Sequence, residues 1–322
     1  MASYRVLISD SVHPVAEELL REHDVGVDIF PDKTPSELEE IVGDYHGWIV
    51  RSGTKVTPDL LDAATSLKVI GRAGVGVDNI DLEAATRKGV LVMNAPHGNT
   101  VSTAEHTISL MLALSREIPQ AYESLKEGKW ERKKFLGSEV YGKTLGVIGV
   151  GKIGRNVAER MQGFGMSVIG FDPVLSEDTA DRLGVELVPL EELYRRSDYI
   201  TIHTPLNEHT RGMVDAEALT ACKDEVRIIN CARGGIVDEQ DLLEAVEAGE
   251  VAGAALDVYS EEPPGEALEG LIQHPDVVAT PHIAASTGEA QRKVAEQITR
   301  QVISALHGES VKSPVNSMAI KM

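Results

Sequence analysis

The sequence predicts two doubly wound α/β domains, each built around a parallel sheet. Short apolar segments typical of buried strands alternate with helix-like segments along the chain. A glycine-rich turn lies in the middle of the chain instead of near its start, so a complete domain can precede it. With 322 residues, 42% of them hydrophobic, and 29 glycines for turns, the chain is long enough for two such cores.

The first hundred residues are predicted to form a sheet of their own. Helix-like segments at 15–22 and 36–42 alternate with strand-like segments, which lie at residues 5–9, 27–30, 49–50, 69–70 and 90–93. Because this alternation is complete before the glycine-rich turn, we expect a separate, flavodoxin-like first domain.

A long helix is predicted to connect the two domains. Ser102 and Glu105 have the spacing of a capping box, and apolar residues follow at helical spacing. A second long helix, at about 287–306, can return the chain to the first domain. The expected domains are therefore residues 1–98 with 289–322, and residues 99–288 as an insertion.

The glycine-rich turn has the pattern of a dinucleotide-binding site. It follows the apolar segment 145–148 and precedes residues with helical spacing. Its first two glycines allow a tight turn and close approach of a pyrophosphate, and its third allows helix and strand to pack closely. The expected contacts with the cofactor are Gly149, Gly151, Lys152, Ile153 and Gly154.

An acidic residue at the end of the next strand indicates which dinucleotide binds. Asp172 follows the apolar segment 168–171, 23 residues after Gly149. A carboxylate there can bond the ribose hydroxyls of NAD and would repel the additional phosphate of NADP. The sequence thus predicts a Rossmann-type NAD-binding domain, although a SAM-dependent methyltransferase would also fit the turn by itself.

Four further strand-like segments follow Asp172, at residues 199–202, 226–229, 252–256 and 277–279. Ligands of open α/β sheets collect outside the carboxyl ends of the strands. The candidate site residues therefore lie directly after these strands, at residues 203–206, 231–235, 257–264 and 281–282.

Ordered motifs over nearly the whole chain resemble the NAD-dependent D-2-hydroxyacid dehydrogenase family, and most closely its branch that oxidises 3-phosphoglycerate. They lie at residues 50–57, 71–79, 128–135, 149–154, 230–238, 256–264 and 280–287. A methyltransferase has no use for this ordered set. The resemblance implies oxidation of 3-phosphoglycerate to 3-phosphohydroxypyruvate with NAD, a step of serine biosynthesis. The alternatives are a glyoxylate, hydroxypyruvate or other 2-keto acid reductase and a less favoured non-enzymatic NAD-sensing scaffold.

The resemblance places the family's catalytic residues at Arg233, Glu262 and His282, and their chemistry suits hydride transfer. Histidine titrates closest to neutral pH, so His282 fits the base that takes the hydroxyl proton. A carboxylate on the other ring nitrogen stabilises the imidazolium, and an arginine fork binds the substrate carboxylate and polarises the carbonyl oxygen. His203 is the competing base, and Glu261 is the competing carboxylate.

The resemblance also implies binding residues. Asp257 corresponds to a ligand of the nicotinamide carboxamide, with capping of a strand end as its alternative role. The expected cofactor contacts at strand ends are His203, Thr204, Pro205, Cys231, Ala232, Arg233, Asp257 and His282. The expected substrate contacts are Arg51, Ser52, Val75, Gly76, Arg233, His282, Arg132 and Lys133.

Two of these substrate contacts also suggest a dimer. Arg132 and Lys133 form a basic patch in an acidic chain, as a phosphorylated acid would require, although a solvated loop would look the same. In related enzymes this segment reaches toward the partner subunit, which implies a homodimer. Only 17 residues follow Ala305, so we expect no C-terminal regulatory domain of the kind that many members of that branch carry.

The composition argues against several classes of partner. A net charge of −20 speaks against nucleic acid and favours a halophilic source, where molar salt screens the self-repulsion. Cys222 and Cys231 lack a metal-binding pattern, so no metal is expected. No apolar run is long enough for a membrane span, and the first residues resemble a strand instead of a signal peptide, so we expect a cytoplasmic protein.

Overall fold

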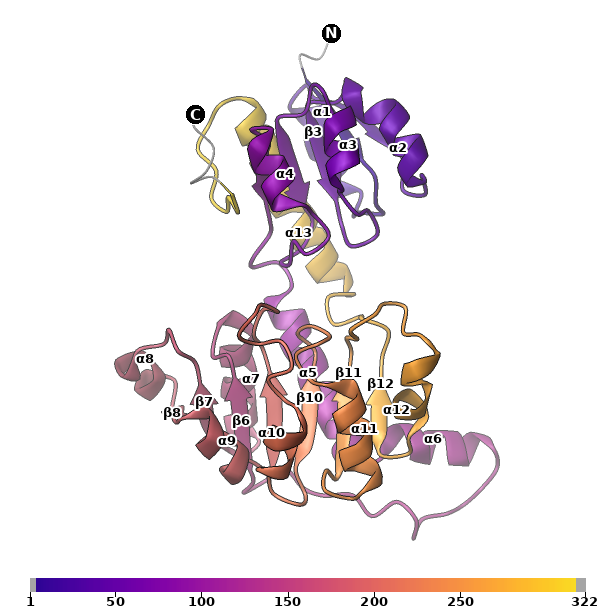
Figure 1. Cartoon of the computed structure of the whole chain (residues 1–322), viewed down its shortest axis with the longest axis vertical. Coiled ribbons are helices and arrows are strands. Elements are labelled where there is room, and N and C mark those ends of the chain that lie inside the picture. Colours follow the sequence, from indigo (N-terminus) through magenta and orange to yellow (C-terminus); the bar gives the residue numbers. More distant parts are fainter. Residues whose placement is uncertain (1–3, 317–322) are drawn as a thin grey trace. The chain divides into compact units, whose positions relative to one another are not determined.

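The computed structural model describes residues 4–316 and divides the chain into two compact units. One unit combines the chain up to Asn99 with the chain from Ser286 onward, and the other is Thr100–Ala285. Each contains one parallel sheet, which Figure 1 shows with its helices. The predicted fold class, two doubly wound α/β domains, is therefore confirmed.

The first unit has a five-stranded sheet in the flavodoxin-like order β2-β1-β3-β4-β5. Its strands are β1 (Arg5–Ile8), β2 (Gly26–Ile29), β3 (Gly47–Val50), β4 (Val69–Arg72) and β5 (Leu91–Met93). Its helices are α1 (Val15–Glu22), α2 (Pro35–Ile41), the 3-10 helix η1 (Val42–Asp44), α3 (Pro58–Ala63), α4 (Leu82–Arg87) and α13 (Gly288–Leu306). The sequence alone did not predict α3 and α4, which have only six residues each.

Successive side chains of a strand point to opposite faces of this sheet, and helices cover both faces. Val6 and Ile8 pack against α1 and α13 on one face, whereas Leu7, between them, packs against α2 and α3 on the other face. Helix α13 lies so close to β4 that a Cβ on Gly71 would come within 2.6 Å of Val302. The last helix therefore belongs to the same core as the first strand, although 280 residues separate Ile8 from Gly288 in sequence.

The second unit has a seven-stranded sheet in the order β12-β11-β10-β9-β6-β7-β8. Its strands are β6 (Thr144–Ile148), β7 (Ser167–Phe171), β8 (Glu186–Leu187), β9 (Tyr199–Ile202), β10 (Arg227–Asn230), β11 (Gly253–Leu256) and β12 (Val277–Ala279). The strand order reverses beside β6, whose neighbours are β7 and β9. Such a switch point is where doubly wound sheets bind their ligands.

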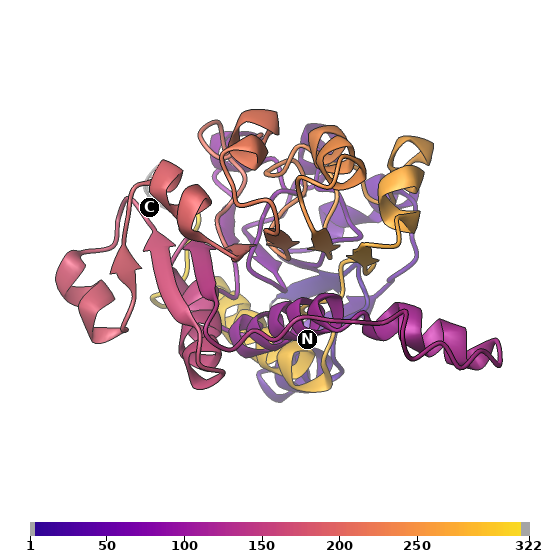
Figure 2. The ribbon, with the colours of Figure 1, turned by 90° about the horizontal axis from the view of Figure 1, so that it is seen from below.

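Helices cover both faces of this second sheet. They are α5 (Thr100–Ser115), α6 (Ile118–Lys126), α7 (Lys152–Gly163), α8 (Glu177–Arg182), α9 (Leu190–Arg196), α10 (Ala216–Thr220), α11 (Glu239–Glu247), the 3-10 helix η2 (Glu266–Leu268) and α12 (Glu269–Gln273). Figure 2 shows the orange helices α11 and α12 on the opposite side of the strands from α5.

One local prediction was wrong. Helix α5 begins at Thr100, so Ser102 lies within its first turn and does not cap it. The Ser102 hydroxyl instead donates to the carbonyl oxygen of Ala284, 182 residues away.

Over the described residues, no helix is long and apolar enough to cross a membrane, and no group of three or more potential metal ligands occurs.

Candidate active site

The glycine-rich turn joins β6 to α7 at the switch point of the second sheet. Gly149 has a positive φ of 90°, and a Cβ there would lie 2.8 Å from the carbonyl oxygen of His203. A Cβ on Gly154 would lie 2.1 Å from the carbonyl oxygen of Gly149. Both positions therefore require glycine for close packing of the protein against itself.

Gly151 differs from these two glycines because nothing lies within 4 Å of where its Cβ would be. This glycine precedes the first residue of α7, where backbone N–H groups are unpaired and favour an anion. Nearby, Thr204 has a buried hydroxyl oxygen without a hydrogen-bond partner among the described residues. An open glycine face and an orphaned hydroxyl at a switch point fit a dinucleotide.

Asp172 lies at the end of β7, beside the turn. Its Oδ2 accepts a hydrogen bond from the N–H of Val150 at 3.0 Å, and its Oδ1 accepts from Val174 and Leu175. These bonds hold the carboxylate beside the turn. Each oxygen of a carboxylate can accept a further bond, which is the capacity that ribose hydroxyls would need.

The remaining predicted cofactor contacts differ in exposure. Lys152 is exposed at the start of α7, whereas Ile153 is half-buried and packs against the core of the unit. Pro205 is exposed and Ala232 is half-buried. Cys231 has its side chain in the core, where burial raises the pKa of its thiol to about 12, so this residue can offer a ligand only its backbone.

Arg233 follows β10 in a turn that Asn230 holds. The Asn230 side chain accepts from the N–H of Ala232 at 3.0 Å and donates to the carbonyl oxygen of Arg233 at 2.9 Å. The next residue, Gly234, packs so closely that a Cβ would lie 1.8 Å from the carbonyl oxygen of Tyr259. The Arg233 turn therefore lies directly against the loop that leads to Glu262.

Glu262 and His282 form a hydrogen-bonded pair after the carboxyl ends of β11 and β12. The Nδ1 atom of His282 lies 2.7 Å from Oε2 of Glu262, and Oε1 accepts from the N–H of Tyr259 at 3.2 Å. The two side chains are 43% and 38% exposed, so a substrate can reach them. Glu261, the competing carboxylate, makes no hydrogen bond within the described residues.

The environment keeps Glu262 charged. Burial acts to raise the pKa of Glu262, but the hydrogen bond and the charge of His282, with the N–H of Tyr259, outweigh it and leave the pKa below its usual value. A carboxylate can only accept, so Nδ1 of His282 must carry a hydrogen. In the neutral ring, Nε2 is then the basic atom.

His203, the competing base, has a different environment. Its Nε2 lies 2.9 Å from the hydroxyl of Thr201, in the strand that ends just before it, and burial lowers its pKa to about 3. A neutral imidazole with a hydroxyl partner has no carboxylate to stabilise its protonated form. The geometry thus favours His282 as the base. The backbone of His203 instead packs closely against the turn at Gly149.

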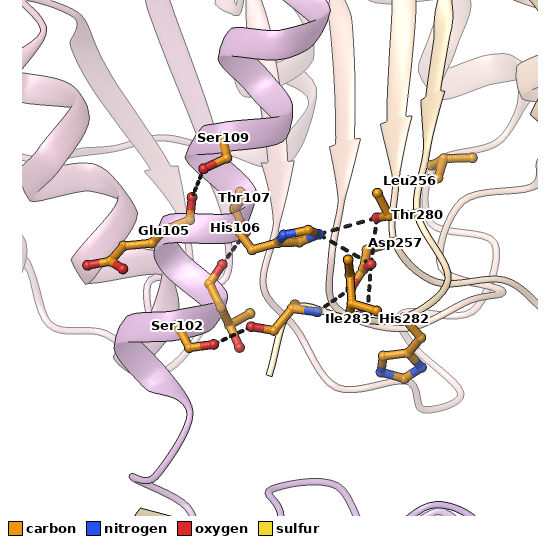
Figure 3. A network of polar contacts seen from close by, with 12 residues as sticks. Ser102, Glu105, His106, Thr107, Ser109, Leu256, Asp257, Thr280, His282 and Ile283 are labelled. Atoms are coloured by element: carbon orange, nitrogen blue, oxygen red, sulfur yellow. Dashed lines mark hydrogen bonds and ion pairs between the residues drawn. The ribbon is translucent and has the colours of Figure 1, made fainter. Parts of the chain in front are cut away.

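Asp257, predicted to contact the cofactor, is fully buried in this structure, and its role toward the cofactor stays a prediction. Its side chain is 0% exposed, and its oxygens accept bonds from the Thr280 hydroxyl and from the backbone N–H groups of Ile283 and Ala284. The Nε2 atom of His106 lies 3.3 Å from Oδ1. Figure 3 shows the His106 ring pointing toward Asp257 and Thr280. These four donors hold the carboxylate against the turn around His282, which fits the alternative role of a capping group without testing the contact with the cofactor.

In the first unit, two predicted substrate residues follow β3 in a loop held by the buried Asp10 and the half-buried Asn79. Asp10 accepts from the N–H of Arg51 at 2.5 Å and from that of Thr54 at 3.2 Å. Asn79 donates to the carbonyl oxygens of both residues at 2.6 Å. The position of Arg51 and its neighbour Ser52 is therefore set by the fold of this unit.

Val75 and Gly76 follow β4 in the same unit. Asn94 fixes this segment by donating to the carbonyl oxygen of Val75 at 2.7 Å. Within the described part of the chain, no acceptor binds the backbone N–H groups of Val75 and Gly76. Two neighbouring N–H groups without partners are suited to bind a carboxylate.

Arg132 and Lys133 lie in the segment after α6. A surface hollow of about 640 Å³ is lined by residues 130–134. Lys134 pairs with Glu131 at 4.0 Å, whereas Arg132 and Lys133 form no ion pair with any residue that the structure describes. Both side chains are therefore available to an anion.

Several polar residues around the site were not predicted. His106, Thr280 and Tyr259 contact the segments that carry His282 and Glu262, and Asn230 holds the turn of Arg233. Thr280, Tyr259 and Asn230 lie within the family motifs, but the motifs alone indicate no role for them. Nothing in the sequence pattern of α5 distinguishes His106.

Together, the switch-point turn and the histidine–carboxylate pair define the class: an α/β oxidoreductase domain that binds a dinucleotide. A family model, "D-isomer specific 2-hydroxyacid dehydrogenase, NAD binding domain", matches residues 108–284. The chain belongs to this family of dehydrogenases. The cofactor predicted from the turn and Asp172 is confirmed as NAD.

Individual relatives are more specific. The chain is 50% identical to D-3-phosphoglycerate dehydrogenase of Homo sapiens over 316 residues and 49% identical to that of Bacillus subtilis over 317, in each case 98% of this chain. It spans 59% and 60% of those relatives' lengths. The solved structure of a glyoxylate reductase from Paecilomyes thermophila matches with a TM-score of 0.88 at 31% identity, covering 99% of this chain and 100% of that one.

Proposed function

We propose that this chain transfers a hydride between NAD and 3-phosphoglycerate, forming 3-phosphohydroxypyruvate, as a step of serine biosynthesis. The observation that carries the chemistry is the 2.7 Å contact between Nδ1 of His282 and Oε2 of Glu262. The names of relatives at about 50% identity support the substrate.

His282 acts as the general base in the oxidation. Its Nε2 accepts the hydroxyl proton of the substrate while Glu262, bonded to Nδ1, stabilises the imidazolium that forms. Bound NAD supplies the acceptor for the hydride. After the oxidation the imidazolium releases this proton to solvent, which restores the neutral base for the next turnover. In the reverse direction the imidazolium donates its proton to the carbonyl oxygen.

Arg233 binds the substrate's carboxylate and oxygen. The guanidinium is always charged and presents a planar set of donors, so it orients a 2-hydroxy acid and polarises its carbonyl. Arg51, Ser52 and the free N–H groups of Val75 and Gly76 are further substrate ligands in this proposal.

The working form in this proposal is a homodimer. Large apolar side chains are exposed on α6 and just after it, namely Ile118, Tyr122, Leu125, Trp130, Leu136 and Tyr141. Monomers seldom leave so many large apolar groups exposed together, and a partner subunit would cover them. Arg132 and Lys133, in the same segment, then bind the substrate phosphate. A change of Leu125→Lys should give a monomer in sedimentation; an unchanged dimer would exclude this surface.

We further propose a cytoplasmic location, since the two free cysteines are compatible with a reducing compartment.

The alternative substrate is a smaller 2-keto acid, and the glyoxylate reductase structure supports keeping it. A panel of phosphohydroxypyruvate, hydroxypyruvate, glyoxylate and pyruvate, each with NADH and with NADPH in molar KCl, separates the two. The proposal expects the highest kcat/KM with phosphohydroxypyruvate and NADH. Preference for glyoxylate would refute the substrate but not the chemistry, and no turnover with any acid would refute the chemistry.

A further inference from the structure

The turn that carries His282 is anchored by the buried carboxylate of Asp257, which the mechanism above does not use. Oδ1 accepts from the Thr280 hydroxyl at 2.6 Å and from the N–H of Ile283 at 2.9 Å, and Oδ2 accepts from the N–H of Ala284 at 2.9 Å. Asp257 thus bonds residues on both sides of His282. The shape of the turn depends on where this carboxylate lies.

His282 requires such an anchor because its backbone is in the left-handed region, with φ at 52°. This conformation is unfavourable for a residue with a Cβ and persists only where surrounding contacts hold it. Its N–H donates to the carbonyl oxygen of Thr280 at 3.1 Å, and the Tyr259 hydroxyl donates to the same oxygen. Thr280 is therefore held by both its backbone and its side chain.

His106 is the group that fixes the carboxylate from the other side. It reaches from α5, with 18% of its side chain exposed, and its Nε2 lies 3.3 Å from Oδ1 of Asp257 and 3.2 Å from Oγ1 of Thr280 (Figure 3). The Thr280 hydroxyl donates its only hydrogen to Asp257, so it can only accept a hydrogen bond from His106. Nε2 of His106 must therefore carry a hydrogen and donate to both.

Helix α5 contacts the same turn at a second point. Ser102, one helical turn before His106, donates to the carbonyl oxygen of Ala284. Residues four apart lie on the same face of a helix, so this face of α5 is bonded to both ends of the turn. The two contacts tie a catalytic loop to a rigid element that is far away in sequence.

We propose that His106 is a positioning residue that acts on the proton-transfer pair through Asp257 and Thr280. By fixing the turn from Thr280 to Ala284, it keeps Nδ1 of His282 against Glu262. The inference rests on the proposed function of His282 as the base, and it assigns Asp257 to the same positioning network.

Kinetics give the first test. His106→Leu removes the donor, and we expect kcat to fall about tenfold, as for loss of one hydrogen bond to a charged group, with KM and the Kd of NADH changed less than twofold. His106→Gln keeps an N–H within reach of Asp257 and should recover at least half of kcat. The matched control, Ser109→Ala, loses a bond inside α5 to Glu105 and should leave kcat unchanged. An unchanged kcat in His106→Leu, or no recovery in His106→Gln, would overturn the proposal.

Nitrogen NMR of the imidazoles gives a second test that does not depend on turnover. The Nδ1–H signal of His282, identified by its loss in His282→Asn, should show a strong hydrogen bond in the parent and in His106→Gln. The signal should weaken in His106→Leu. If that variant is unstable, Thr280→Val removes the bridging hydroxyl and should weaken it too. If the His282 signal is unchanged in both variants, the positioning role is refuted, whether or not the protein turns over any 2-keto acid. If the signal weakens but the protein turns over no 2-keto acid, only the proposed function is refuted.

Discussion

Replacing Glu262 with glutamine removes one charge and little else. Glutamine retains an oxygen that can accept from Nδ1 of His282, so the tautomer and the ring orientation stay as they are. What is lost is the attraction between the carboxylate and the imidazolium, which forms as the hydroxyl proton is removed. An effect specific to that step should lower kcat and leave KM nearly unchanged.

The distance between the two groups sets the size of the effect. Coulomb's law for unit charges 2.7 Å apart gives about 6 kcal/mol at an effective dielectric constant of about 20 and about 1.5 kcal/mol in water. Because the side chains are 43% and 38% exposed, solvent screening places the value near the lower end. A loss of about 1.5–3 kcal/mol corresponds to a fall in kcat of roughly 10- to 150-fold.

The assay follows the appearance of NADH absorbance during oxidation of 3-phosphoglycerate, the direction in which the imidazolium forms, by the parent, Glu262→Gln and the matched control Glu261→Gln. Because the pKa of Glu262 is below its usual value, its carboxylate is already charged throughout the neutral range. The deficit of Glu262→Gln should therefore be constant there and shrink only as the pH falls through that lowered pKa. A kcat within twofold of the parent, or an equal loss in Glu261→Gln, would refute the reasoning.

Three further changes test other parts of the structure. Gly154→Ala places a methyl group 2.1 Å from a backbone oxygen, so a denaturant titration should show a loss of about 1–3 kcal/mol of unfolding free energy. Gly151→Leu, where nothing lies nearby, should melt within about 5 °C of the parent and lose NADH binding. The opposite pattern would contradict the roles assigned to the two glycines. Asp172→Ala should weaken NADH at least tenfold more than NADPH in a fluorescence titration, and equal weakening would exclude the ribose contact. The melting temperature should rise with KCl because of the net charge of −20, and a flat curve would remove the halophile hypothesis.

Local patterns predicted every strand of the two sheets except β8, which has only two residues. A buried parallel strand is a short apolar run, and each such run before and after the glycine-rich turn became a strand. Short helices such as α3 and α8, of six residues each, have too few turns for their periodicity to be recognised. The Ser102 prediction failed because a capping-box spacing does not reveal that a carbonyl from a distant loop will take the hydroxyl.

The sequence predicted those site residues that both lie in a family motif and have the side-chain chemistry that the reaction needs. A histidine and a glutamate after neighbouring parallel strands lie near each other because the strand ends do. Sequence position gave no information on burial, so the full burial of Asp257 and its bonds around His282 were not foreseen, and its contact with the cofactor stays a prediction. His106 was missed because its partner Thr280 lies 174 residues away, a contact that only the folded chain creates.

The most direct test of the central claim is turnover by His282→Asn. The account predicts that phosphohydroxypyruvate reduction falls at least about a thousandfold, since the general acid and base is lost, while NADH binds with the parent's affinity. Turnover within about tenfold of the parent would show that another group, such as His203, moves the proton.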